Sequence, residues 1–371
     1  MNIGITCYPT YGGSGVVATE LGIGLASRGH SVHFISYEMP FRLDKYYKNI
    51  FFHEVEMLEY PLFKYPPYSL SLSVKMAEII QSEKLDILHV HYAMPHAASA
   101  YLAKKIVGDE KIKIVTTLHG TDITLVGNHH SFHTMTKFSI EQSDGVTCVS
   151  EFLKRTTLNT FNICRDMEVI YNFVDTGIYK KSSNYRNTNL IEPEDNVIIH
   201  ISNFRPVKRI GSIIKIFCNI SKKIKSKLLL VGDGPEMCKI RNMVSKLDID
   251  DKVLFMGRQD NIIPLLNISD LYMLPSKSES FGLSALEAMS CEVPVIGTSM
   301  GGLKEVVEDG ISGYICDPDD IGKMSKIAIS ILASKKRRTE MGKAARERAK
   351  AFDSSRIIDK YLEYYNKILA G

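Results

Sequence analysis

The sequence contains no run of about 18 consecutive apolar residues, the length that a membrane-spanning helix needs. Its first seven residues carry no positive charge ahead of an apolar stretch, so we expect no signal peptide. The seven cysteines are odd in number and form no Cys-x-x-Cys pair. This pattern indicates reduced thiols and argues against a structural metal site. We therefore expect a cytoplasmic protein without an integral membrane segment.

A large charge excess is also missing. The 46 Lys and Arg residues against 42 Asp and Glu residues give a net charge of +4 over 371 residues. This value is far below the basic excess of a nucleic-acid-binding protein, so we expect no nucleic-acid partner, although it suits a site for anions. The length fits two domains, and a hydrophobic content of 44% is typical of a globular chain. A homo-oligomer is compatible with these values.

Short β-branched runs alternate with helical patterns along the chain, which predicts parallel sheets built from βαβ units. The predicted strands of the first half are 2–7, 31–36, 50–57, 86–91, 112–118 and 145–149. Those of the second half lie near 196–201, 227–231, 253–256, 270–274, 293–297 and 313–316. Helical periodicity is clear at 16–27 and 71–81. The alternation predicts an α/β protein of two Rossmann-like, doubly wound domains that face a central cleft.

A polar stretch at 180–195 interrupts this rhythm near the midpoint and predicts an interdomain linker. We assign residues 1–180 to an N-terminal domain, 181–195 to the linker and 196–352 to a C-terminal domain. The last stretch, 353–371, predicts an amphipathic helix that either packs on its own domain or crosses back to the first. Because ligands bind at the carboxyl ends of parallel strands, the residues that follow the strands are the candidates for chemistry.

A glycine-rich loop follows the first predicted strand. Gly13, Gly15 and the helix after them could approach a phosphate closely, and Ser14 lies between them. Gly13-x-Gly15-x-x-Ala18 also matches the dinucleotide fingerprint, with Glu38 at the end of the second strand, which keeps a nicotinamide-dependent oxidoreductase as an alternative. The Tyr-Pro-Thr-Tyr insert before the glycines weakens that match. A tight turn with glycines for helix packing is the plain alternative.

The second half contains two loops with charged residues. Arg205, Lys208 and Arg209 follow the strand that ends near residue 201 and are placed to neutralise a diphosphate, unless they form a solvated basic loop. Glu279 and Glu287 lie eight residues apart after the strand at 270–274. If a helix begins at Phe281 or Gly282, Glu279 lies in the loop and Glu287 inside the helix. Carboxylates accept from vicinal hydroxyls, and N–H groups at the helix start would face a phosphate or sugar oxygen.

Histidines gather after two strands of the first half. His119 begins a His-Gly-Thr-Asp segment, and His91 to His96 follow the preceding strand. His89 and His91 share one strand face, where packed or hydrogen-bonded histidines are commoner than metal ligands. We expect an exposed loop start at His129, His130 and His133, and turns at the two Asp-x-Asp pairs, 248–250 and 317–319. No metal site is therefore predicted.

Taken together, these residues resemble the family 4 retaining glycosyltransferases, whose fold is of the GT-B type. The resemblance covers nearly the whole chain. It rests on the glycine loop 12–15, His119-Gly-Thr-Asp, Lys208, Val231-Gly-Asp-Gly-Pro235, Glu279-x7-Glu287 and Gly301-Gly-Leu-x-Glu305. The family usually has an Arg five or six residues before the phosphate Lys. Asn203 stands five residues before Lys208 here, and Arg205 would take over that charge.

The resemblance implies a nucleotide-sugar domain in the second half and an acceptor domain in the first. It implies catalytic roles for Lys208, Arg205, Glu279 and His119. The implied donor-binding residues are Gly13, Ser14, Gly15, Asn203, Arg205, Lys208, Arg258, Glu279, Phe281, Gly282, Leu283 and Glu287. The candidates for acceptor binding, chosen by loop position, are Ser14, Tyr92, Thr121 and Arg155.

Within the family, the stretches 7–15, 89–96, 119–127 and 202–209 resemble enzymes that transfer N-acetylglucosamine from UDP-N-acetylglucosamine to L-malate, the first step of bacillithiol biosynthesis. The implied partners are a UDP-sugar and a small dicarboxylate, with no metal or further cofactor. Three alternatives stay open: another small or lipid acceptor, the nicotinamide-dependent oxidoreductase, and a sugar-nucleotide sensor without catalysis.

Overall fold

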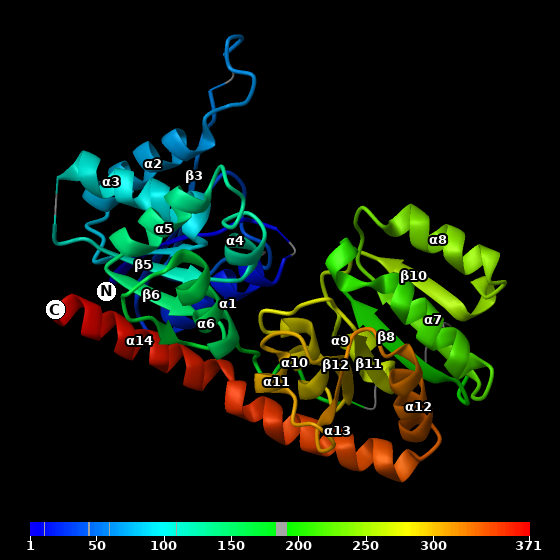
Figure 1. Ribbon diagram of the computed structural model, residues 1–371. Coiled ribbons are helices and arrows are strands. Elements are labelled where there is room, and N and C mark those ends of the chain that lie inside the picture. Colours follow the sequence, from blue (N-terminus) through cyan, green and yellow to red (C-terminus); the bar gives the residue numbers. More distant parts are fainter. Residues whose placement is uncertain (11, 44, 59, 109, 183–190) are drawn as a thin grey trace. The chain divides into compact units, whose positions relative to one another are not determined.

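The computed structural model describes residues 1–10, 12–43, 45–58, 60–108, 110–182 and 191–371, and the chain divides into two α/β units (Figure 1). Unit 1 comprises Met1–Asn172 together with Ser354–Gly371, and unit 2 comprises Phe173–Asp353. The predicted linker at 181–195 falls within unit 2. Its residues 183–190 lie outside the described residues. Lys181 and Ser182, just before them, bond to Asn267 of unit 2.

The sheet of unit 1 has seven parallel strands in the order β3-β2-β1-β4-β5-β6-β7. They are β1 (Asn2–Thr6), β2 (Ser31–Ser36), β3 (Ile50–Glu54), β4 (Ile87–His91), β5 (Lys113–Leu118), β6 (Gly145–Cys148) and β7 (Glu168–Val169). The sequence predicts the first six, although β3 ends at Glu54 rather than at 57. It does not predict β7, because a two-residue edge strand has no periodic pattern.

Helices fill the connections of unit 1. They are α1 (Gly13–Ser27), α2 (Tyr68–Ser82), α3 (Ala98–Val107), α4 (Thr121–Thr124), α5 (His133–Gln142) and α6 (Glu151–Phe161). The central strand β4 is buried along its whole length. This agrees with its unbroken apolar and histidine sequence, since a strand covered on both faces has no polar side. An apolar cluster that includes Met76, Ile80, Leu88 and Ile114 joins α2 to this sheet.

Unit 2 repeats the plan with six parallel strands in the order β10-β9-β8-β11-β12-β13. They are β8 (Asn196–Ile201), β9 (Ser226–Val231), β10 (Val253–Gly257), β11 (Leu271–Leu274), β12 (Val295–Thr298) and β13 (Gly313–Cys316). The helices are α7 (Ile210–Ser221), α8 (Met237–Lys246), α9 (Ile263–Ile268), α10 (Leu283–Ser290), α11 (Leu303–Val306), α12 (Ile321–Leu332) and α13 (Lys335–Ala349). All six strands agree with the sequence prediction to within two residues at each end.

The last helix, α14 (Ser354–Ala370), belongs to unit 1 and lies beside α1 (Figure 1, red). Its buried tyrosines face the sheet, where the Tyr364 hydroxyl donates to the Val146 carbonyl at 3.2 Å. On its outer side Asp359 pairs with Arg28, the residue that follows α1, at 3.0 Å. The sequence leaves two placements open for this helix. The observed contacts of α14 are with α1 and with the sheet of unit 1.

Each sheet has one point at which the strand order reverses direction. In unit 1 it lies between β1 and β4, and in unit 2 between β8 and β11. Loops at the carboxyl ends of the two strands beside such a point diverge and leave a crevice for ligands. The loops that the sequence singles out, at 7–15, 92–96, 202–209 and 275–282, are those that follow these four strands. No helix of the described chain is both long and apolar enough to cross a membrane.

Candidate functional site

An ion pair joins the two loops beside the reversal point of unit 2. The Lys208 Nζ atom lies 2.6 Å from Oε1 of Glu279. Lys208 ends a short 3-10 helix, Pro206–Lys208, that follows β8, and Glu279 lies in the loop after β11. The backbones are also joined, since the Lys277 N–H donates to the Val207 carbonyl at 2.7 Å. The structure therefore brings together two residues that the sequence separates by 71 positions.

Glu279 is held from several sides. Its side chain is buried, and the Ser276 hydroxyl donates to the same Oε1 atom at 2.6 Å. Its backbone N–H donates to the Met300 carbonyl at 3.0 Å, and its carbonyl accepts from Gly302 N–H at 2.7 Å. Gly301 has φ +117°, and a Cβ there would lie 2.0 Å from the Glu279 carbonyl oxygen. The Gly301-Gly302 segment is thus a clamp that only glycine permits at position 301.

Glu287 lies inside α10, which begins at Leu283 after the N-cap residue Gly282 (φ +96°). The sequence predicts this arrangement, with Glu279 in the loop and the second, buried carboxylate more than one turn inside the helix. In the first turn the Ser284 hydroxyl accepts from Tyr272 O–H at 2.6 Å. Phe281 is buried.

His200 lies beside this pair and was not singled out from the sequence. Its Nδ1 atom is 2.8 Å from the Met273 carbonyl and its Nε2 atom 2.7 Å from the Ser202 hydroxyl. A carbonyl only accepts, so Nδ1 carries the proton and Nε2 accepts from Ser202. Burial lowers the pKa of His200 to about 4, which keeps the ring neutral. A polar residue in the apolar strand 196–201 was the signal that could have indicated it.

The other basic residues of unit 2 differ in their partners. Arg205 is exposed and forms no ion pair with any described residue, and Asn203 is exposed as well. Arg209 pairs instead with Asp319 at 2.6 Å, in the turn after β13. Arg258 follows β10 and lies 3.8 Å from Asp233. Of the three cations at 205–209, Arg205 is therefore the one that has no carboxylate partner among the described residues.

The loops of unit 1 gather aromatic rings instead of an ion pair. The His91 Nδ1 and His119 Nε2 atoms are 2.8 Å apart, and the two rings are stacked. Tyr92 packs against His119 with ring centroids 5.4 Å apart, and its hydroxyl accepts from Ser14 Oγ at 3.1 Å. Burial lowers the pKa of His119 to about 3. The ring of His119 is therefore neutral.

Asp122 ties the two loops of unit 1 together, a role that the sequence does not reveal. One carboxylate oxygen accepts from the Ala93 N–H at 3.2 Å, and the other accepts from the N–H groups of His119 at 3.1 Å and Gly120 at 2.8 Å. Burial raises the pKa of Asp122 to about 6. The residue that ends the His-Gly-Thr-Asp segment thus fixes the backbone that carries His119.

The remaining candidates of unit 1 occupy different surroundings. A Cβ at Gly15 would lie 2.6 Å from the Thr10 carbonyl oxygen and 2.7 Å from that of Tyr8, so this glycine lets the preceding loop fold onto α1. Gly13, the first residue of α1, is exposed. Thr121 opens α4 directly after the His119 loop. Arg155 lies exposed on α6 and forms no ion pair with a described residue.

Groups of three or more His, Cys, Asp or Glu side chains that could hold a metal ion are absent from the described residues. His129 and His130 are exposed in the segment before α5, and His133 is the first residue of that helix. Asp317 and Asp319 lie in a turn, as the sequence predicts. Asp248 lies in a turn as well, whereas Asp250 begins a short 3-10 helix, Asp250–Lys252.

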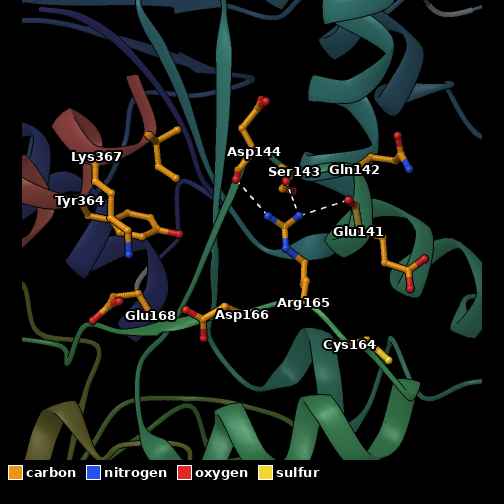
Figure 2. Close-up of a pocket in the computed structure, with 11 residues that line it drawn as sticks. Glu141, Gln142, Ser143, Asp144, Cys164, Arg165, Asp166, Glu168, Tyr364 and Lys367 are labelled. Carbon is orange, nitrogen blue, oxygen red and sulfur yellow. Dashed lines mark hydrogen bonds between the residues drawn. The ribbon is translucent and has the colours of Figure 1, made fainter. Parts of the chain in front are cut away.

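A pocket of about 640 Å³ lies at another edge of unit 1 (Figure 2). Its lining includes Ser143 and Asp144, which precede β6, so it lies at the amino ends of the strands, away from the loops described above. Arg165 fills its centre and donates to carbonyls at the end of α5, including those of Ile140 and Asp144 at 3.0 Å each. This guanidinium caps α5. We therefore take the pocket as structural and place the candidate site at the carboxyl ends.

Two family models match the chain, one in each half. Residues 11–177 match the model described as Glycosyltransferase Family 4, and residues 181–348 match that described as Glycosyl transferases group 1. The N-acetyl-alpha-D-glucosaminyl L-malate synthase of Bacillus anthracis is 50% identical over 100% of this chain and 97% of that protein. An uncharacterized glycosyltransferase of Methanocaldococcus jannaschii is 27% identical over 91% of this chain and 90% of that protein.

Solved structures of low sequence identity share the fold. Sucrose-phosphate synthase from Thermosynechococcus elongatus superposes with a TM-score of 0.83 at 19% identity, over 100% of this chain and 99% of that one. Anabaena HepE in complex with UDP and glucose superposes with a TM-score of 0.83 at 18% identity, over 99% of each chain.

Proposed function

Since this chain belongs to the family 4 glycosyltransferases and has their GT-B fold, we propose that it transfers N-acetylglucosamine from UDP-N-acetylglucosamine to the hydroxyl group of L-malate with retention of the anomeric configuration. This reaction is the first step of bacillithiol biosynthesis. The observation that carries the proposal is 50% identity over the whole chain to the Bacillus anthracis synthase, whose name states this product. Membership of the family removes the nicotinamide-dependent oxidoreductase from the alternatives.

We assign the donor to unit 2. Lys208 and Arg205 neutralise the diphosphate, Glu279 accepts from hexose hydroxyls, and Glu287 accepts from the ribose hydroxyls. The Lys208–Glu279 pair at 2.6 Å supports this assignment, because a preformed cation and carboxylate can be shared between a phosphate and a hydroxyl group without reorganisation. Asn203, Phe281 and Gly282 lie in the same loops, Leu283 begins α10, and Arg258 follows β10. We propose these residues as further donor contacts. Gly13 and Gly15 of unit 1 are proposed donor contacts at the start of α1.

In the proposed reaction, the bond between the anomeric carbon and the diphosphate breaks while that carbon bonds to the malate hydroxyl oxygen. The hydroxyl proton passes to the departing phosphate oxygen on the same face of the sugar, so no separate base is needed. Lys208 stabilises the charge that develops on UDP, which is the largest electrostatic contribution that the residues offer. His119 lines the donor sugar from unit 1. We propose that no metal ion takes part.

We assign the acceptor to unit 1, with Ser14, Tyr92, Thr121 and Arg155 as its contacts. The Ser14–Tyr92 hydrogen bond at 3.1 Å supports a shared polar surface there. L-malate carries two carboxylates, so Arg155 must approach them for this assignment to hold. We place the enzyme in the cytoplasm, which the seven free cysteines support.

The test is to incubate the protein with UDP-N-acetylglucosamine and L-malate, with and without a chelator, and to measure UDP release and product mass. We expect equal UDP and glycosylated malate, and a product whose anomeric proton has the donor's configuration by NMR. Release of UDP only with a different hydroxyl compound would replace malate by that acceptor. Tight binding of the UDP-sugar without UDP release would support the alternative of a sugar-nucleotide sensor without catalysis. Loss of turnover with the chelator would overturn the metal-free reaction.

A further inference from the structure

His91 and His119 share a hydrogen bond between their rings, at the carboxyl ends of β4 and β5. The Nδ1 atom of His91 lies 2.8 Å from Nε2 of His119, and the ring planes are within 26° of each other with centroids 5.1 Å apart. A neutral imidazole has one N–H and one lone pair. One ring must therefore donate and the other accept, so the tautomer of His91 determines that of His119.

Both rings are neutral at physiological pH. Burial lowers the pKa of His119 to about 3 and that of His91 well below its ordinary value. The remaining choice is between two neutral arrangements. Either His91 donates from Nδ1 and His119 carries its proton on Nδ1, or His119 donates from Nε2 and leaves a bare Nδ1.

The second nitrogen of His91 decides between them. Its Nε2 atom is buried and has no hydrogen-bond partner in the described chain. If His91 accepted at Nδ1, Nε2 would carry an unpaired buried N–H. If His91 donates from Nδ1, Nε2 is only an unpaired lone pair. Orphaned buried donors are the rarer of the two in proteins, so the arrangement in which His91 donates is favoured.

His91 has little freedom to rearrange. Its carbonyl accepts from the Nδ1 atom of His96 at 2.5 Å, and the ring of His89 lies against its own with centroids 4.5 Å apart. His89 is fixed in turn by the Tyr365 hydroxyl of α14, 2.6 Å from Nδ1, and by the Thr117 hydroxyl, 2.7 Å from Nε2. Two strands and the returning helix thus support the ring that contacts His119.

We propose that His91 is a positioning residue that holds His119 in the Nδ1–H tautomer, so that His119 offers an N–H donor to a substrate oxygen. His119 is half-buried, and its Nδ1 atom forms no hydrogen bond with a described residue, which leaves it open to a ligand. Hydroxyl, carboxylate and phosphate oxygens all accept such a bond. The proposal rests on the proposed function only for the identity of the substrate.

The chain contains a matched control for this pair. His33 and His53, on β2 and β3, form a second hydrogen bond of the same kind, with Nδ1 and Nε2 3.0 Å apart and rings stacked at 5.3 Å. Replacing His33 by Leu removes a ring-to-ring hydrogen bond from the same sheet without touching the loops that carry Tyr92 and His119. Its effect on turnover measures the cost of a general disturbance of unit 1.

The first experiment is ring nitrogen NMR of protein labelled with ¹⁵N-histidine, in which His119→Asn identifies the resonances of His119. We expect a protonated Nδ1 and a bare Nε2 in the wild type. In His91→Leu we expect the Nε2–H form to appear, because free imidazole side chains favour it. In His91→Asn an amide N–H can take the place of Nδ1–H and restore the wild-type pattern.

The second experiment is steady-state kinetics. We expect His91→Leu to lower kcat about tenfold, the effect of one lost hydrogen bond in the transition state, with KM for the UDP-sugar changed less than about twofold. His91→Asn should recover kcat to within about threefold of the wild type, and His33→Leu should leave it unchanged. Calorimetric binding of UDP to each variant verifies that unit 2 is intact.

A protonated Nε2 on wild-type His119 overturns the proposal, as does an unchanged His119 tautomer in His91→Leu. Equal losses of kcat in His91→Leu and His33→Leu would also overturn it, by showing a general loss of stability. If His91→Leu does not fold, the wild-type spectrum decides. Because the spectra need no substrate, absence of product with L-malate would refute the proposed acceptor and leave this test standing.

Discussion

Units 1 and 2 share the same central strand order and place their loops at equivalent reversal points, yet their side chains differ in kind. The loops of unit 2 hold an ion pair, Lys208–Glu279, and nearby in sequence Arg205 forms no ion pair with a described residue. Those of unit 1 hold neutral rings, among them His91, Tyr92 and His119. All eleven histidines except His200 belong to unit 1.

The difference teaches that topology fixes where a site forms, whereas the side chains fix which charge it tolerates. A preformed cation beside a carboxylate suits a diphosphate that gains charge as it leaves. Neutral rings and hydroxyl groups that are hydrogen-bonded to one another are suited to orient the hydroxyl groups of a substrate. The two units should therefore respond differently to acid and to the loss of single groups.

The largest expected effect is a separation of the two units by acid. Unfolded histidines bind a proton below about pH 6.5. Burial lowers the pKa of His89 and His119 to about 3 and that of His96 and His200 to about 4. Unfolding then takes up protons, so stability falls as the pH drops from 6.5 toward 4, by up to about 1.4 kcal/mol per pH unit for each buried histidine.

Asp122 acts with the opposite sign, because its raised pKa of about 6 makes the native state bind a proton first between pH 6 and 4. The effect of Asp122 on stability cancels that of about one buried histidine in unit 1. Unit 1 still has more buried histidines with a lowered pKa than unit 2, which has only His200 among its described residues. Hydrogen exchange with mass spectrometry at pH 7 and 5, corrected for intrinsic rates, should show β4 and β5 losing protection before β8 and β11. Equal loss in both sheets, or earlier loss in unit 2, would break the comparison.

Next in size is the loss of the unit 2 cation. Lys208→Ala removes the charge that stabilises departing UDP, and we expect kcat to fall at least about 100-fold, the usual effect of one such group. Lys215→Ala, an exposed lysine of α7, is the matched control and should leave kcat unchanged. A loss below about tenfold, or 1.4 kcal/mol of barrier, would remove Lys208 from this role.

A smaller effect sharpens the description of unit 1. Tyr365→Phe leaves the buried Nδ1 atom of His89 without its hydrogen-bond partner, and we expect the free energy of unfolding to fall by about 2 kcal/mol in urea titrations. Tyr364→Phe, one residue earlier on α14, removes only a 3.2 Å bond to the Val146 carbonyl and should cost less. A larger loss of unfolding free energy in Tyr364→Phe would show that the bond to the Val146 carbonyl stabilises α14 more than the bond to His89 does.

The smallest expected effect concerns the support of Glu279. Ser276→Ala removes the hydroxyl that donates to Oε1 at 2.6 Å, and we expect KM for the UDP-sugar to rise about fivefold, or about 1 kcal/mol. Ser330→Ala, which removes a hydroxyl bond to the Ile327 carbonyl on α12, serves as the control. An unchanged KM in Ser276→Ala would mean that Lys208 and the Gly301 clamp are enough to hold the carboxylate.

Local features of this protein followed from the sequence alone. The alternation of strands and helices, the loops that follow each strand, and the positions of Glu279 before α10 and Glu287 inside it all depend on residues within a few turns of one another. Such patterns depend on backbone propensity and on the burial of one face, which a linear sequence expresses directly. The two-residue strand β7 is too short for a period and was not predicted.

Only the tertiary structure decided which distant residues meet. The pairing of Lys208 with Glu279, the ring contact of His91 with His119, the bonds of Asp122 to Ala93 and the return of α14 onto His89 all join segments from different strands. Strand order sets these contacts, and hydrophobic periodicity contains no information about order. For the same reason the sequence proposes Arg155 for the acceptor site from its loop position alone. This assignment stays a proposal, because the reach of the side chain depends on how α6 packs.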